Sequence, residues 1–86
     1  MSATDDGPTM VLVTRADLTL STGKLAAQCA HAAVDCALVA KRSASRLFER
    51  WKAGGARKIV VQCDTLEEMK RLYGAAQKAN LVTSMI

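Results

Sequence analysis

Two different hydrophobic periods alternate along this chain of 86 residues, and that alternation constrains its fold more than any other feature. Met10-Val11-Leu12-Val13 and Lys58-Ile59-Val60-Val61-Gln62-Cys63 are short apolar runs rich in β-branched residues, typical of buried strands. Between them, the stretch from Thr22 to Lys41 has the period of a helix and holds seven alanines. Strands that alternate with helices predict an α/β fold, with helices on both faces of one sheet.

The remaining segments extend this pattern with two shorter helices and one more strand. A helix fits Ala44 to Lys52, and Gly54-Gly55 ends it. Thr65-Leu66-Glu67-Glu68 is a capping box, the signature of a helix start, and Asn80 is the expected C-terminal cap of the helix that follows. Residues 81–86 are expected to form a third strand in the same sheet.

Length and composition indicate one small domain. A chain of 9.2 kDa has room for a single domain, expected at residues 9–86, while residues 1–8 are small and polar and predict a disordered leader. No apolar run approaches the roughly 18 residues of a membrane span. The three cysteines lack the paired spacing of a disulfide framework or a zinc site. These features predict a cytoplasmic protein without a membrane partner or a bound metal.

Positive charge is concentrated in one part of the chain. The formal net charge is +4, and seven of the 12 Lys and Arg residues lie between residues 41 and 58, beside a single acidic residue, Glu49. Such a stretch is typical of a surface that binds nucleic acid and equally of an ordinary solvated face, so both interpretations stand. Aromatic residues make up only 3% of the chain, which argues against recognition of RNA bases by aromatic stacking.

The long predicted helix carries a polar stripe. Lys24, Gln28, His31 and Asp35 are spaced by four, three and four residues, which places them along one face. Lys24 falls in the first turn, where free N–H groups and the helix dipole favour an anion. His31 could transfer a proton near neutral pH, with Asp35 to orient its ring. An ordinary polar face accounts for the same spacing, although Gln and His are less usual there than Lys and Glu.

The residues around this stripe resemble a known family. The segment Gly23-Lys24-Leu25-Ala26-Ala27-Gln28-Cys29-Ala30-His31-Ala32 resembles the signature of the type 2 peptidyl-tRNA hydrolases, the archaeal and eukaryotic form. Arg15 and Asp17 before it, and Trp51 and Lys58-Ile59-Val60-Val61 after it, are similar to that family in type and spacing. The resemblance covers essentially all of residues 9–86. It implies a three-layer α/β/α sandwich around a small mixed sheet.

The same resemblance implies an activity and a set of site residues. The family hydrolyses the ester between a peptide and the 3′ ribose of tRNA, which returns tRNA to translation. Lys24 would bind a phosphate or stabilise an oxyanion, Gln28 would position substrate or water, and His31 would act as a base or as an orienting group. Ester hydrolysis of this kind needs no metal or organic cofactor, and peptidyl-tRNA is the implied partner. The implied substrate-binding residues are Arg15, Asp17 and Lys58.

The chain also departs from the family pattern. Members continue past the segment that resembles Leu81 to Ile86 into an Asp-Ala-Gly-x-Thr segment and a fourth strand, neither of which occurs here. Ser21 and Thr22 stand where a Gly and a Lys are usual. We therefore expect a domain that is incomplete at its C-terminus, marginally stable, weakly active or inactive alone, and able to form a homodimer through an unpaired sheet edge. The alternatives are a catalytically inactive RNA-binding domain and a protein-interaction module.

Overall fold

The computed structural model of the chain describes residues 7–86, in which strands and helices alternate as the hydrophobic periods predict. The α/β class is therefore confirmed. Of the leader predicted at residues 1–8, residues 1–6 lie outside the described part of the chain. The elements, in order, are β1 (Met10–Arg15), α1 (Thr22–Ser43), α2 (Ser45–Ala53), β2 (Lys58–Cys63) and α3 (Leu66–Lys78).

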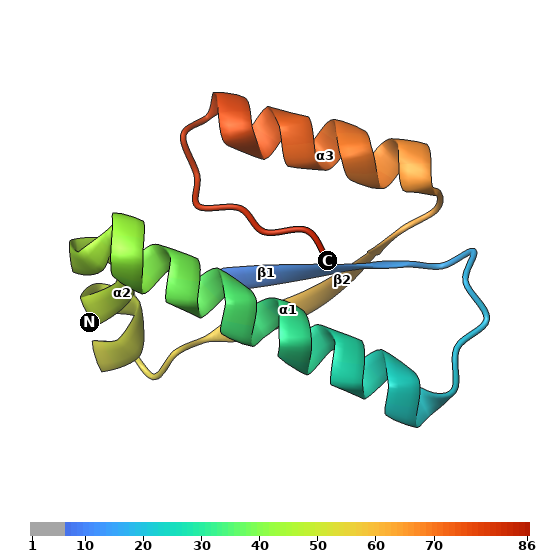
Figure 1. Ribbon diagram of the computed structural model, residues 1–86, viewed down its shortest axis with the longest axis horizontal. Coiled ribbons are helices and arrows are strands. Elements are labelled where there is room, and N and C mark those ends of the chain that lie inside the picture. The colour runs from blue at the N-terminus through green and yellow to red at the C-terminus, as the bar shows by residue number, and fades with distance from the viewer. Residues whose placement is uncertain (1–6) are drawn as a thin grey trace.

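The two strands form a parallel pair that lies between helices. The register runs from Met10 opposite Lys58 to Arg15 opposite Cys63. Parallel neighbours need a long crossover connection, which α1 and α2 supply. Figure 1 shows α1 and α3 flanking the strands from opposite sides, so the chain is an α/β sandwich around a very small sheet.

The third strand expected at residues 81–86 is not formed, so the prediction of a three-stranded mixed sheet is wrong. Within residues 7–86 the sheet has two strands, and they are parallel. Leu81 to Ile86 runs as an irregular segment between α3 and the strands (Figure 1). The Leu81 N–H bonds the Ala76 carbonyl at 3.0 Å, which ends α3 and does not extend the sheet. A strand requires a neighbour whose N–H and C=O groups are in register, and a β-rich composition alone does not supply one.

Local sequence signals set the two ends of α3. The Thr65 hydroxyl accepts a hydrogen bond from the Glu68 N–H at 3.2 Å, and the Glu68 carboxylate accepts one from the Asp64 N–H at 2.7 Å. The predicted capping box is thus formed, with its return bond one residue before the N-cap. At the other end Asn80 has a φ of +61°, the left-handed conformation typical of a residue that terminates a helix.

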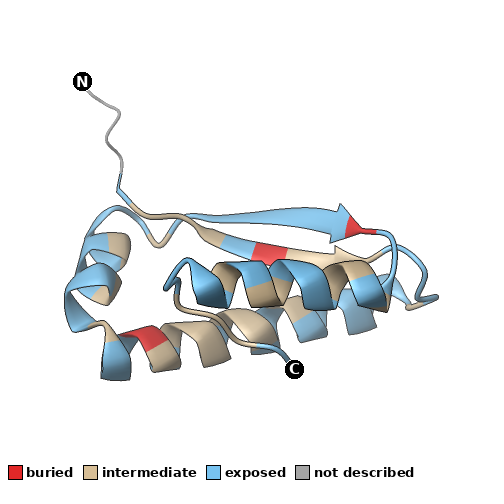
Figure 2. Ribbon diagram, turned by 90° about the horizontal axis from the view of Figure 1, so that it is seen from above, coloured by how far each residue is buried: buried red, intermediate tan, exposed pale blue. Residues whose placement is uncertain are grey.

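The hydrophobic core is small and open on one side. In the described part of the chain, the buried apolar residues are Leu12 on β1, Ala40 on α1 and Cys63 at the end of β2 (Figure 2). Many large apolar side chains stay exposed, among them Val60 at 58% and Leu81 at 61%. A fully buried core residue normally touches six or more others, and side chains as exposed as these lack neighbours on one side. The apolar faces of the helices therefore line a cleft here and do not close over an interior.

Candidate active site

One edge of the sheet gathers most of the candidate residues. Because β1 and β2 are parallel, their carboxyl ends at Arg15 and Cys63 lie side by side. Helix α1 begins beyond this edge (Figure 1), with Ser21 as its N-cap: the Ser21 hydroxyl accepts a hydrogen bond from the Lys24 N–H at 3.2 Å. In open α/β sheets, ligands bind in the crevice outside the carboxyl ends of the strands. A site is therefore expected at this edge.

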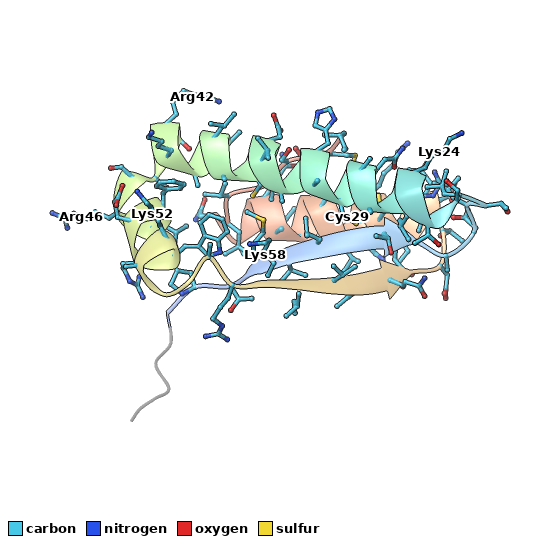
Figure 3. The ribbon with its side chains drawn as sticks, turned by 90° about the horizontal axis from the view of Figure 1, so that it is seen from below. Lys24, Cys29, Arg42, Arg46, Lys52 and Lys58 are labelled. Atoms are coloured by element: carbon cyan, nitrogen blue, oxygen red, sulfur yellow. The ribbon has the colours of Figure 1, made fainter. Side chains whose placement is uncertain are left out.

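The polar stripe of α1 starts at this edge and follows the helix. Lys24, Gln28 and His31 are all exposed, and Figure 3 shows Lys24 at the end of α1 with its side chain directed away from the helix. Gln28 also borders the cleft between α1 and α3. An ammonium group, an amide and an imidazole thus lie within two turns of one another on one accessible face. These groups can bind an anion, hold a polar group and transfer a proton.

Asp35, the fourth member of the stripe, has a partner far away in the sequence. It is half-buried, and its carboxylate accepts a hydrogen bond from the hydroxyl of Ser84. This contact ties the segment after α3 to the middle of α1. Sequence reasoning did not identify Ser84 as a partner, and no spacing rule relates two residues that are 49 positions apart.

Arg15 and Asp17 form a two-bond ion pair just after β1. Arg15 Nε lies 3.0 Å from Asp17 Oδ1, and Arg15 Nη2 lies 2.9 Å from Asp17 Oδ2. The two hydrogen bonds from Arg15 lower the pKa of the Asp17 carboxyl, and the bond to Asp17 raises the pKa of the guanidinium. Both groups are charged across the physiological range, and the pair fixes the start of the loop that leads to Lys24.

An apolar cleft of about 640 Å³ lies next to the stripe. It runs between α1 and α3 along β1, and the segment from Leu81 to Ile86 contributes to its lining. Leu25, Cys29 and Cys36 line the cleft and are not packed into a closed core: Leu25 is 36% exposed and both cysteines are half-buried. Burial, with a smaller contribution from the neighbouring Asp35, raises the pKa of the Cys36 thiol. Cys36 is therefore a protonated, apolar wall residue at neutral pH.

Lys58 does not join the other candidate residues. It begins β2 opposite Met10, at the amino end of the sheet, whereas Arg15 is at the carboxyl end. Its ammonium group lies 5.4 Å from the centre of the Trp51 ring and 2.6 Å from the Ala56 carbonyl oxygen. The structure thus brings Arg15, Asp17, Lys24 and Gln28 to one edge, continues the stripe to His31, and places Lys58 at the opposite end.

The described residues hold no group of three His, Cys, Asp or Glu side chains arranged for a metal ion. Across residues 7–86, the helices also lack the combination of length and apolar character that a membrane span requires.

Comparison with known proteins identifies close sequence relatives. A family model described as peptidyl-tRNA hydrolase PTH2 matches residues 8–86. The chain is 35% identical over 77 residues to the peptidyl-tRNA hydrolase of Thermoplasma volcanium, across 90% of this chain and 66% of that protein. It is 41% identical over 81 residues to the peptidyl-tRNA hydrolase of Sulfurisphaera tokodaii, across 90% and 67%. It is 40% identical over 77 residues to the probable peptidyl-tRNA hydrolase 2 of Schizosaccharomyces pombe, across 90% and 38%.

The chain therefore spans about two thirds of the length of these archaeal relatives and less of the Schizosaccharomyces pombe protein.

Proposed function

Because this chain belongs to the peptidyl-tRNA hydrolase PTH2 family, we propose that it hydrolyses the ester that joins a peptide to the 3′ ribose of tRNA. The observation that carries the proposal is the exposed stripe of Lys24, Gln28 and His31, which begins at the carboxyl edge of the sheet. A carboxylic-ester hydrolase needs a group that stabilises negative charge and a group that manages a proton. The stripe holds one of each.

The reaction assigns a task to each residue of the stripe. A water oxygen attacks the ester carbonyl carbon, the bond from that carbon to the ribose oxygen breaks, and the ribose oxygen takes a proton. Lys24, in the first turn of α1, stabilises the oxyanion or holds a nearby phosphate with the free N–H groups. Gln28 orients the water or the substrate carbonyl. His31 takes the proton from water or orients the group that does.

Arg15 and Asp17 support substrate binding at the same edge. The two hydrogen bonds to Asp17 hold the guanidinium in one orientation and leave other N–H donors of Arg15 for a phosphate of the RNA. Lys58 lies too far along the sheet to take part in this contact and binds the RNA elsewhere. We further infer that the protein acts in the cytoplasm on peptidyl-tRNA and forms a homodimer.

The proposal is tested by peptidyl-tRNA turnover. We expect His31→Gln to lower kcat/KM by about 10²–10⁴-fold, the usual contribution of a positioned acid or base. Lys24→Gln is expected to lower it by about 10²-fold or more, because one oxyanion contact is removed. Lys78→Gln, which removes an exposed charge at the far end of α3, is the control and retains the parent rate.

Two results would reject the proposal. One is a kcat/KM for peptidyl-tRNA that is the same in all three variants as in the parent chain. The other is tRNA binding by the parent chain without any ester cleavage, which would identify it as an inactive RNA-binding domain.

A further inference from the structure

The basic residues gather at the end of the molecule away from Lys24. They come from the last turn of α1, from α2, from the connection before β2 and from the start of β2, and all are exposed. Figure 3 shows Arg42, Arg46 and Lys52 at one end of the helices and Lys24 at the other. Glu49 is the single acidic residue in this stretch. We name this surface the basic end; its residues are Lys41, Arg42, Arg46, Arg50, Lys52, Arg57 and Lys58.

Helix dipoles explain the position of some of these cations but not of the others. Cations in the last turn of a helix are favourable, and Lys41, Arg42, Arg50 and Lys52 occupy such positions. Arg46 lies in the first turn of α2, where a cation is unfavourable, and Lys58 belongs to a strand. The charge at the basic end is therefore greater than helix stability requires.

The basic end is held by a well-defined scaffold. The Trp51 indole N–H donates a hydrogen bond to the Arg57 carbonyl at 2.9 Å, and Trp51 packs against Phe48 with ring centres 6.0 Å apart. Lys58 lies over the Trp51 ring. These contacts fix α2 against the start of β2, so all of the cations except Arg57 project from regular elements.

Helix α1 sets the distance between the basic end and the candidate active site. Lys24 and Arg42 are separated by five turns of the helix and therefore lie on the same face, about 27 Å apart. Figure 3 shows both on the side of α1 away from the sheet. At about 3.4 Å or less per step, this separation spans about eight or more base pairs of a duplex.

We propose that the basic end binds the phosphate backbone of the double-helical RNA stem next to the scissile ester. The inference rests on the proposed function and adds a second contact, about 27 Å from Lys24. A duplex is favoured over single-stranded RNA because the cluster offers cations and no open aromatic face: Phe48 and Trp51 are half-buried, and Lys58 covers the Trp51 ring. Recognition through phosphates does not depend on base sequence, which suits a protein that acts on many tRNAs.

The first test compares two pairs of substitutions with the same loss of charge. Arg46→Gln with Lys52→Gln alters the basic end, and Lys70→Gln with Lys78→Gln alters α3; all four residues are exposed, and Gln is a good helix former. Binding to a fluorescent RNA hairpin is measured by anisotropy across a salt series. We expect the first pair to weaken binding about tenfold and to reduce the salt slope by about two, one per cation lost.

The control pair should leave the affinity within about twofold, since exposed charges away from the contact have little effect. An equal change in hairpin affinity for both pairs, or no change in affinity for either pair, would overturn the proposal. Circular dichroism confirms that each variant keeps the helices of the parent chain.

The second test uses stem length. A hairpin of about four base pairs cannot reach from Lys24 to the basic end, whereas one of about twelve can, at about 3.4 Å or less per step. Both hairpins carry a single-stranded 3′ end, and neither carries an ester. We expect Arg46→Gln with Lys52→Gln to weaken binding of the long hairpin only; equal weakening of both would overturn the proposal.

The two proposals fail separately. Because the hairpins have no ester, stem-dependent binding without turnover of peptidyl-tRNA would reject the hydrolase and retain the basic end. Turnover of peptidyl-tRNA, together with a salt slope that Arg46→Gln with Lys52→Gln leaves unchanged, would retain the hydrolase and reject the basic end as an RNA-binding surface.

Discussion

At the scale of single residues, Arg15 and Asp17 provide a direct test of the electrostatics at the candidate active site. Two hydrogen bonds stabilise the charged form of Asp17, so its pKa in the folded chain is lowered. A carboxyl group with a lowered folded pKa stabilises the fold above its unfolded pKa, and that contribution is lost as the pH falls through the folded value. Loss of the pair under acid conditions therefore loosens the loop after β1.

We predict that Arg15→Gln raises the titration midpoint of the Asp17 carboxyl toward the ordinary value of about 3.9. The midpoint is measured from the carboxyl carbon shift in an NMR pH titration. Lys70→Gln removes the same charge from α3, far from the pair, and should leave the midpoint in place. A midpoint that is equal in the parent chain and in Arg15→Gln would show that the pair does not form in solution.

At the scale of elements, the start of α3 depends on one hydroxyl group. The Thr65 side chain satisfies a backbone N–H that the first turn of a helix leaves without a partner. We predict that Thr65→Ala lowers the free energy of unfolding by about 1 kcal/mol, within the range of about 0.5–2 kcal/mol for such caps. Urea unfolding followed by circular dichroism measures this difference.

Thr65→Ser keeps the hydroxyl and serves as the control, with stability close to that of the parent chain. If Thr65→Ser were as unstable as Thr65→Ala, the methyl group and not the hydrogen bond would account for the loss.

At the scale of the whole molecule, the dominant feature is the open edge of β1 beside the apolar cleft. Within residues 7–86, no backbone hydrogen bond joins this edge to the segment from Leu81 to Ile86. Unpaired edges next to apolar surface favour association with another chain. A second copy supplies a suitable partner because its own segment from Leu81 to Ile86 carries exposed apolar side chains and pairs with no strand, and exchange of identical elements is a common route to dimers.

We predict that Val11→Lys shifts the chain toward monomer in analytical ultracentrifugation, since a charge at a strand edge opposes pairing. Val34→Lys is the matched control on α1: the two valines are 53% and 59% exposed, so each substitution loses similar apolar surface and gains one charge. A parent chain that is monomeric at all concentrations, or dissociation by both variants alike, would contradict the prediction.

The sequence by itself determined the features that depend on near neighbours. Periodicity located the strands and helices, the capping box located the start of α3, and residue spacing placed Lys24, Gln28 and His31 on one face of α1. Each of these features depends on residues that are close together in the sequence, so the sequence alone predicts it.

Only the tertiary structure decided how distant segments meet. Leu81 to Ile86 has the composition of a strand, yet it remains unpaired because strand formation depends on a neighbour with backbone groups in register. The same holds for the bond between Ser84 and Asp35, and for the placement of Lys58 at the opposite end of the sheet from Arg15. A contact between residues far apart in the chain is set by packing of whole elements, which spacing along the sequence does not encode.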